Sequence, residues 1–321
     1  MPKFFSQYFT PTQIGIIFSM MPIARFLTPF IFLKKPLTKK DYILSIIIAF
    51  LASFLLLSKN FYLILIAFFL IGSAFSVIFP YIEAIAIEKL KTKYGKARVT
   101  GSIGFMLYGI IFSYIKTNHI INFLVLMFLT ALSSLYFKED KTIKKNASKI
   151  DFLKDYKFWL GLIFLQISFG GFYNFFTIYL IKHGIPKEYI GWLWGIGVGA
   201  EIIIFLIGHK FLDKLKPIKW IKISILLTSI RWLILYLFAN SIILISLSQL
   251  IHAFSFAIFH TSALLYISKK YQNKTLAQQF YAGIGYGLAA FLGSIISGFL
   301  YGDKLFLYEA VIALIGFLVM L

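Results

Sequence analysis

The chain has 321 residues, of which 60% are hydrophobic, 19% aromatic and only 14% charged. A soluble domain of this length has too small an interior to hide so much apolar surface, so the composition predicts a protein solvated by a lipid bilayer. The net charge of +20 comes from lysines in short loops between apolar runs, which favours cytoplasmic loops of a membrane protein over nucleic-acid binding. The absence of cysteine excludes disulfides, thiolate metal sites and cysteine nucleophiles.

Apolar runs of spanning length follow one another along the chain and predict an all-α polytopic membrane protein. Residues 1–12 are too short and too polar to hold the apolar core of a cleavable signal peptide. Pro and Gly interrupt some runs, which helices inside a membrane tolerate. We expect eleven transmembrane helices, at about residues 13–33, 42–58, 61–83, 99–116, 119–137, 158–181, 189–208, 218–239, 241–267, 276–301 and 304–321.

The longest polar segment, KEDKTIKKNASKIDFLKDYK at residues 138–157, separates five of these helices from the other six. This division predicts an N-terminal helical half at 1–137, a cytoplasmic central loop at 138–157 and a C-terminal six-helix half at 158–321.

Basic residues are shared unevenly between the two sets of alternating loops. One set holds 24 of the 32 and the other holds six, while Arg25 and Arg231 lie inside apolar runs. Because an excess of Lys and Arg marks the cytoplasmic side, we expect the first set and the C-terminus in the cytoplasm of a bacterium, with the helices in its inner membrane. The first set lies at 34–40, 89–98, 138–157, 210–222 and 269–274, and the second is Lys3, Lys59, Lys116, Lys182, Lys187 and Lys304.

Two pairs of segments indicate an internal repeat. IGIIFSMMPIAR (14–25) aligns with IGWLWGIGVGAE (190–201) at an offset of 176, which places Arg25 on Glu201. LIGSAFSVIFPYIEAIAIEKL (70–90) aligns with LIHAFSFAIFHTSALLYISKK (250–270) at an offset of 180. Parallel repeats of this kind build the two halves of one large class of transporters.

The repeat also predicts that most of a first helix is absent. The helix at 158–181 precedes the second copy, and its counterpart in the first copy would begin before residue 1 and end near residue 5. We therefore expect a twelve-helix protein of which eleven helices are visible, through a late start codon or a genuine truncation.

Four stretches of the chain carry a family resemblance: TPTQIGIIFSMMPIARFLTP (10–29), YGKARVTGSIGF (94–105), GFYNFFTIYLIKHGIPKEYIGWLWGIGVGAEIIIF (171–205) and SQLIHAFSFAIFHTSALLYISK (248–269). They resemble the major facilitator superfamily, and within it the phenylpropionate-permease-like branch, which is related to the lactose permease and nucleoside–proton symporter groups. The resemblance implies a major facilitator fold of two pseudo-repeat halves and proton-coupled symport of a small organic solute. The basic motif usual between the second and third helices of that superfamily is degenerate here, as LKKPLTKKD.

Ionisable side chains inside the apolar runs are the strongest candidates for function, because a charge is costly within a membrane. Glu201 shares a helix face with Trp194, which predicts a cavity wall with a proton-exchanging acid and a stacking surface. Arg231 needs either a carboxylate partner, which could be Glu201 or the solute, or a water-filled cavity. A purely structural ion pair is the alternative for both residues.

Two histidines lie in the run at 241–267. Imidazole suits a proton relay, and we prefer His252, which has Gln249 one turn before it, over His260. Eight residues turn a helix by about 80° beyond two full turns, so we expect only one of these rings to face a cavity. The acid that the lactose permease type carries one turn after this histidine is replaced by Ser255, which leaves Glu201 or His252 as the expected proton carrier.

The remaining candidates lie in other helices. Arg25 and Glu83 are intramembrane charges of the N-terminal half that could pair with each other or with the absent helix. Tyr173 and Asn174 follow Gly170-Gly171, a pair that would let the helix bend so that both side chains reach a solute; a packing role is equally compatible.

The expected function is secondary active transport of a small organic solute, with an aromatic or other carboxylate favoured by Arg25 and Arg231. No ATP-binding, H-E-x-x-H or catalytic-triad motif is present, so we expect no enzyme activity, no metal and no cofactor, with a proton gradient as the energy source. The expected partners are the solute and the bilayer, and the expected state is a monomer. Efflux of amphipathic compounds, a transport-inactive truncated form and a membrane-embedded transferase remain alternatives.

Overall fold

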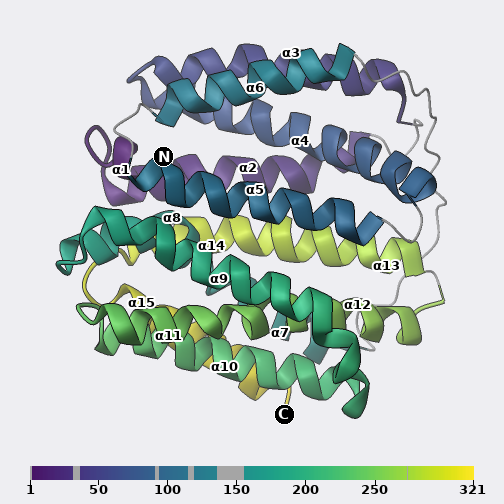
Figure 1. The fold of residues 1–321 in the computed structure, drawn as a ribbon, viewed down its shortest axis with the longest axis vertical. Coiled ribbons are helices and arrows are strands. Elements are labelled where there is room, and N and C mark those ends of the chain that lie inside the picture. Colours follow the sequence, from purple (N-terminus) through teal and green to yellow (C-terminus); the bar gives the residue numbers. More distant parts are fainter. Residues whose placement is uncertain (1, 32–36, 91–93, 115–118, 136–154, 273) are drawn as a thin grey trace.

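The computed structural model describes residues 2–31, 37–90, 94–114, 119–135, 155–272 and 274–321. Helices cross the molecule side by side, with their axes along the short direction of the view in Figure 1. The helices are α1 (Pro2–Phe5), α2 (Pro11–Ile31), α3 (Lys39–Phe54), η1 (Leu55–Leu57), α4 (Phe61–Leu90), α5 (Tyr94–Tyr114), α6 (His119–Leu135), α7 (Tyr156–Ile167), α8 (Gly170–Lys182), α9 (Lys187–Ile207), η4 (Gly208–Lys210), η5 (Leu212–Lys214), α10 (Pro217–Leu237), α11 (Ile242–Leu250), η6 (Phe254–Ile258), α12 (Phe259–Lys270), α13 (Lys274–Tyr281), η7 (Ala282–Ala289), α14 (Ala290–Phe299) and α15 (Leu305–Val319).

Apolar helices of this structure match the eleven predicted runs one for one. Among the described residues, eight helical spans are long and apolar enough to cross a membrane, and three shorter apolar helices occur at 99–112, 120–134 and 305–319. Three of the eight spans are composite: α7 with α8, α11 with η6 and α12, and α13 with η7 and α14. The predicted run at 61–83 was too short, because α4 continues past Pro80 to Leu90.

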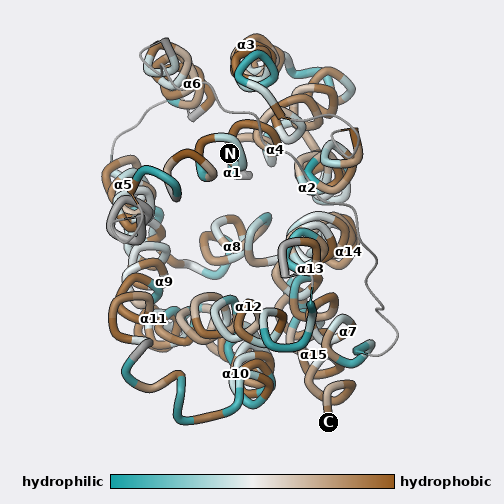
Figure 2. The backbone as a smooth tube through the Cα atoms, turned by 90° about the vertical axis from the view of Figure 1, so that its right-hand side faces the viewer, coloured by the Kyte–Doolittle hydropathy of each residue, from teal (hydrophilic) through white to brown (hydrophobic). Residues whose placement is uncertain are grey.

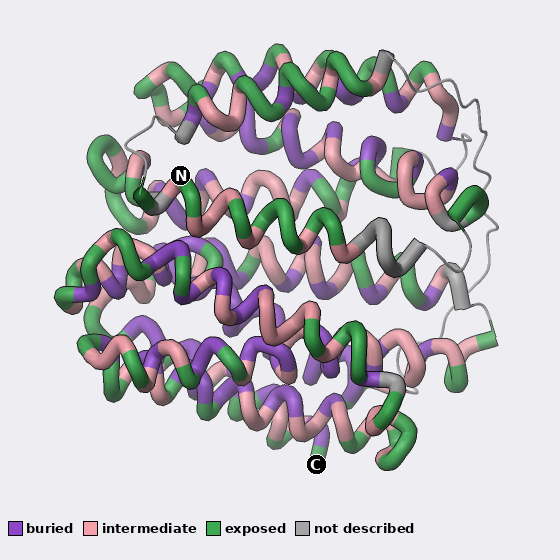
Figure 3. Tube along the Cα trace, in the orientation of Figure 1, coloured by how far each residue is buried: buried purple, intermediate pink, exposed green. Residues whose placement is uncertain are grey.

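Buried and exposed residues alternate along the helices (Figure 3), as expected where one face of a helix packs on its neighbours and the other faces outward. Many of the exposed residues are large and apolar, such as Leu51 in α3, Ile243 in α11 and Leu318 in α15, which are 60%, 70% and 55% exposed. Exposing such an apolar surface to water would be unfavourable, whereas lipid tails solvate it. The fold is therefore that of a multi-pass membrane protein.

The helices form two groups, which we call the N-terminal bundle (α1–α6) and the C-terminal bundle (α7–α15) (Figure 1). The two bundles meet mainly where α2 packs on η7 and α14 and where α5 packs on α9. The short helix α1 contacts α8, which lies near the centre of the view along the helices in Figure 2. The central loop predicted at 138–157 lies outside the described residues except for 155–157.

Glycines allow the closest approach between the bundles. A Cβ added to Gly15 of α2 would lie 2.6 Å from the Ser294 carbonyl oxygen and 2.8 Å from the Gly298 Cα of α14. One added to Gly287 would lie 2.9 Å from the Phe26 Cβ. Gly287, Ser294 and Gly298 therefore form a packing surface for α2, as expected where helices in a membrane associate through close backbone contact.

Each end of the C-terminal bundle is tied by an acid. At one end, the Asp155 carboxylate accepts from the Tyr266 and Tyr271 hydroxyls at 2.7 and 3.2 Å, which joins α7 to the end of α12. At the other end, Lys182 donates to Asp303 at 2.7 Å, and this ammonium lowers the pKa of the Asp303 carboxyl below its ordinary value. The loops at the first end belong to the lysine-rich set, so we call it the lysine-rich end and the other the lysine-poor end.

We expect Gly15→Ala to destabilise the folded protein by about 1–3 kcal/mol, because the new methyl group must push α14 away from α2. Gly199→Ala is the matched control, since a Cβ at Gly199 of α9 meets nothing within 4 Å. Thermal unfolding of the purified variants in detergent measures both effects. Equal midpoints for the two variants would show that the close contact between α2 and α14 does not constrain the fold.

Candidate functional site

A chain of polar side chains crosses the interior of the C-terminal bundle. Arg231 of α10 is fully buried; its Nη1 lies 3.0 Å from His252 Nδ1, and its Nη2 donates to Gln249 Oε1 at 2.8 Å. Because a guanidinium can only donate, Nδ1 of His252 must accept, which places the proton of a neutral imidazole on Nε2. That Nε2 lies 3.7 Å from Glu201 Oε2, so the imidazole connects the acid of α9 to the cation of α10.

Aromatic rings supply the rest of the surroundings of Arg231. Its Cζ lies 4.3 Å from the centre of the Phe172 ring and 4.5 Å from that of Trp232. Within the described residues, no carboxylate forms an ion pair with Arg231. The expected direct pair of Glu201 with Arg231 is therefore wrong in this structure, because His252 stands between the two charges and aromatic faces cover the guanidinium.

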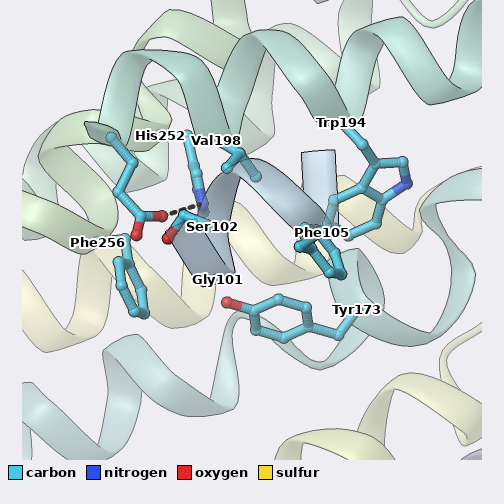
Figure 4. A pocket seen from close by; sticks show the side chains of 9 residues that line it. Gly101, Ser102, Phe105, Tyr173, Trp194, Val198, His252 and Phe256 are labelled. Atoms are coloured by element: carbon cyan, nitrogen blue, oxygen red, sulfur yellow. Dashed lines mark ion pairs between the residues drawn. The ribbon is translucent and has the colours of Figure 1, made fainter. Parts of the chain in front are cut away.

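A cavity of about 270 Å³ opens beside Glu201 and His252 (Figure 4). Its walls come from both bundles: α5 of the N-terminal bundle, and α8, α9 and the α11–η6 span of the C-terminal bundle. The lining residues are Gly101, Ser102, Phe105, Tyr173, Trp194, Val198, Glu201, His252 and Phe256. A pocket between the halves of a membrane bundle, mostly aromatic with few polar groups, suits a small amphipathic solute.

The spacing of residues along α9 builds one wall of this cavity. Trp194, Val198 and Glu201 are four and three residues apart, so a helix brings them to one face. Gly197, one residue before Val198, has no side chain and so leaves room for neighbours: a Cβ there would lie 3.4 Å from His252 and 3.5 Å from Gln249. The predicted cavity face with Trp194 and Glu201 is therefore present in the structure.

Aromatic rings of α8 and α9 face one another across the cavity. The Tyr173 and Trp194 rings lie 6.4 Å apart and nearly parallel, with 20° between their planes. Tyr173 also stacks on Phe169 at 5.5 Å. The sequence singled out Tyr173 and Trp194 separately, and only the fold places their two rings against each other.

His252 and His260 lie closer to the same side of their helical span than the spacing of an α-helix predicts. The segment between them includes the π-helix η6, whose wider turn cancels the expected divergence of an α-helix. Phe256 stacks on His252 at 5.9 Å with 20° between the planes, and on His260 at 6.0 Å with 4°. His260 does not line the cavity; its Nδ1 lies 3.0 Å from the Tyr281 hydroxyl and 3.2 Å from that of Tyr286.

Other predicted residues lie elsewhere. Asn174 does not line the cavity. Its amide donates to the Ser297 hydroxyl of α14 at 3.5 Å, so it contributes to the packing of α8 on α14. Arg25 is exposed on α2 and forms no ion pair within the described residues, so it is not paired with Glu83. Glu83 is half-buried on α4, three residues after Pro80. Ser255 faces α10, where its hydroxyl accepts from Thr228 at 2.9 Å.

Sequence reasoning missed Glu309 of α15, which is 2% exposed and accepts the Gly171 backbone N–H at 2.7 Å. It also missed Ser102, Phe105 and Phe256 as cavity residues. A single acid inside the apolar run LFLYEAVIAL was signal enough to find Glu309. Nothing in an aromatic-rich sequence distinguishes Phe105 or Phe256 from the other phenylalanines before their helices are placed.

The chemistry that this site offers is proton exchange and recognition of an uncharged or aromatic surface. A carboxyl beside an imidazole at a cavity wall can take up or release a proton. Among the described residues, no group of three or more His, Asp or Glu side chains could hold a metal ion.

Comparison with known proteins gives the family of this chain and structures of the same fold. The model of the MFS_1 like family matches residues 3–310. The probable 3-phenylpropionic acid transporter of Escherichia coli K12 is 24% identical over 95% of this chain and 87% of its own length. The uncharacterized transporter YwbF of Bacillus subtilis is 27% identical over 92% and 79%. The crystal structure of the nucleoside transporter NupG superposes with a TM-score of 0.83 at 17% identity, over 97% of this chain and 90% of that one.

The family match covers nearly the whole chain, and a transporter fold with a cavity between its bundles agrees with it. The chain belongs to the MFS_1 like family and is a major facilitator transporter of small solutes from the phenylpropionate-permease-like branch.

Proposed function

We propose that this protein imports a small aromatic carboxylate together with a proton, in the inner membrane of a bacterium. The observation that carries the proposal is the Glu201–His252–Arg231 chain, which ends in a cavity lined by aromatic rings. The name of the Escherichia coli relative, a probable transporter of 3-phenylpropionic acid, supports an aromatic acid as the solute.

Glu201 is the proposed proton carrier. Its side chain is 13% exposed at the cavity wall, while His252 behind it is 8% exposed. Protonating Glu201 removes a negative charge, which would otherwise repel an incoming carboxylate. Proton and solute would therefore favour each other's binding, which is the thermodynamic requirement for symport.

Arg25 is the proposed anion-binding residue. Arg231 is fully buried among His252, Gln249 and two rings and does not line the cavity. Arg25, by contrast, is exposed and without an ion pair in the described part of the chain. It lies on the same side of α2 as Phe18, which packs on Phe5 and Phe68 in the interior of the molecule.

Contacts between the bundles support alternating access around this cavity. Near the lysine-poor end, Gly15 contacts Gly298, and Trp192 donates to the Tyr114 hydroxyl at 2.7 Å. The cavity lies further along α5 and α9, on the side of Ser102 and Glu201. With the lysine-rich end in the cytoplasm, this arrangement corresponds to a state closed toward the outside. Rocking of the two bundles against each other at the glycine contacts would separate their lysine-poor ends and open the cavity toward the outside.

We expect Glu201→Gln to reduce proton-driven accumulation of 3-phenylpropionate by at least about tenfold, because the amide cannot carry the proton. Exchange of labelled for unlabelled solute across the membrane, which needs no net proton movement, should stay within about threefold of the wild type. Uptake into proteoliposomes with and without an inward proton gradient measures the difference. Glu188→Gln, at the exposed start of the same helix, is the control.

Uptake by the wild type that does not respond to the proton gradient would contradict the coupling. Solute entering inside-out vesicles while protons flow out of them would instead establish export, the alternative direction for this fold.

We expect Arg25→Ala to raise the KM for 3-phenylpropionate by about ten- to a hundredfold, the effect of losing a hydrogen bond between charged groups. Competition by the uncharged analogue 3-phenylpropanol should be unchanged, because the alcohol has no carboxylate for Arg25 to bind. Arg25→Lys should recover part of the affinity, since it restores the charge without the bidentate geometry. An equal loss of affinity for acid and alcohol would contradict an anion-binding role.

A further inference from the structure

We infer that Glu309 is a positioning residue for transport: it fixes the break between α7 and α8, and thereby the place of Phe172 and Tyr173 in the site. The inference depends on the proposed function only because it uses the same cavity as the solute site. It assigns to Glu309 the role of a hydrogen-bond acceptor. Glu309 lies on α15, outside the set of residues that line the cavity.

The break leaves a backbone donor without its usual acceptor. α7 ends at Ile167 and α8 begins at Gly170, with Ser168 and Phe169 between them. In an uninterrupted helix, the Gly171 N–H would donate to the Ile167 carbonyl four residues earlier. Here that carbonyl turns toward α14, where a Cβ on Gly293 would lie 2.5 Å from its oxygen. The Gly171 N–H donates to Glu309 Oε1 instead, at 2.7 Å.

Glu309 is placed for this one contact. Its side chain is buried against Gly171, where an added Cβ would lie 2.7 Å from Oε1. The second oxygen, Oε2, is buried and has no hydrogen-bond partner among the described residues. Leu305, one turn earlier on α15, fills the remaining space beside the same glycine. A side chain of this length and shape therefore takes the place of the missing carbonyl.

A second side chain also bonds to the break. Trp232 of α10 donates from Nε1 to the Ser168 hydroxyl at 3.1 Å. Trp232 follows Arg231 directly, and its ring contacts the guanidinium. The break is thus tied to α15 and to the helix that carries the buried cation.

The start of α8 carries the groups that the site needs. Phe172 covers the Arg231 guanidinium, and Tyr173 lines the cavity facing Trp194. These residues are one and two positions after Gly171. Loss of the acceptor would leave the Gly171 N–H buried and unpaired, so the start of α8 would have to shift to satisfy it. Such a shift moves the ring that a solute meets.

The test uses the absence of cysteine in this chain, because Tyr173→Cys then provides a single thiol in the cavity. The labelling rate of this thiol by a membrane-impermeant maleimide is measured in proteoliposomes for the parent and for three second substitutions. Glu309→Leu removes the acceptor, and Glu309→Gln keeps an oxygen acceptor without the charge. Val311→Leu on the outward face of the same helix is the matched control, since Val311 is 47% exposed.

We expect Glu309→Leu to change the labelling rate by at least about fivefold, while Glu309→Gln and Val311→Leu stay within about twofold of the parent. An unchanged rate in Glu309→Leu would overturn the inference. A rate in Glu309→Gln equal to that in Glu309→Leu would also overturn it, because the carboxylate itself would then be required. If Glu309→Leu does not yield folded protein, Gly171→Ala replaces it, since the added methyl group displaces the carboxyl from the same N–H; an unchanged rate there overturns the inference as well.

Uptake provides the functional readout in protein with Tyr173 intact. We expect Glu309→Leu to raise the KM for 3-phenylpropionate by at least about fivefold while Vmax per folded protein stays within about twofold, because the substitution displaces a binding surface and removes no proton carrier. A Glu309→Leu variant that loses Vmax at unchanged KM would contradict this. If the wild type takes up no 3-phenylpropionate, the proposed solute is wrong, and the labelling rates still decide the role of Glu309.

Discussion

The burial of Arg231 is the constraint on which the C-terminal bundle depends. A guanidinium stays charged at any physiological pH, so a site without water must compensate its charge. In the described part of the chain, this compensation comes from His252, Gln249 and the faces of Phe172 and Trp232. These groups belong to α8, α10 and the span that contains α11. Their positions are coupled, because moving any one of them exposes the cation to an apolar interior.

Irregular backbone makes this arrangement possible. The break after Ile167 places Phe172 against the guanidinium. The π-helix at Phe254–Ile258 brings the His260 ring into a stack on Phe256. Interrupted helices leave backbone groups without partners, which a membrane protein tolerates only where other protein groups satisfy them. Glu309 does so at the break. The candidate site therefore lies beside the two interruptions of helical structure, because each interruption places a side chain that the site uses.

Contacts between the two bundles have a different character from those inside the C-terminal bundle. Gly15, Gly287 and Gly298 bring α2 close to η7 and α14. In the proposed alternating-access cycle, the two bundles would pivot at these contacts, while the polar chain around Arg231 would keep the C-terminal bundle together as a unit. The cavity takes walls from both bundles, so a pivot would change its access without dismantling the polar chain.

The sequence alone determined the membrane class, the eleven apolar helices and the shared face of Trp194 and Glu201 on α9, because each depends on composition or on helical periodicity within one segment; the family followed from the resemblance of four stretches of the chain. The sequence singled out Glu201, Arg231 and His252, with Gln249 one turn before the histidine, since charged and polar side chains stand out in apolar runs. Only the tertiary structure decided that His252 separates Glu201 from Arg231, that Asn174 packs on α14 and that Glu309 serves a distant backbone N–H. These facts depend on which helices become neighbours and where a helix breaks, and neither is encoded in the periodicity of a single segment.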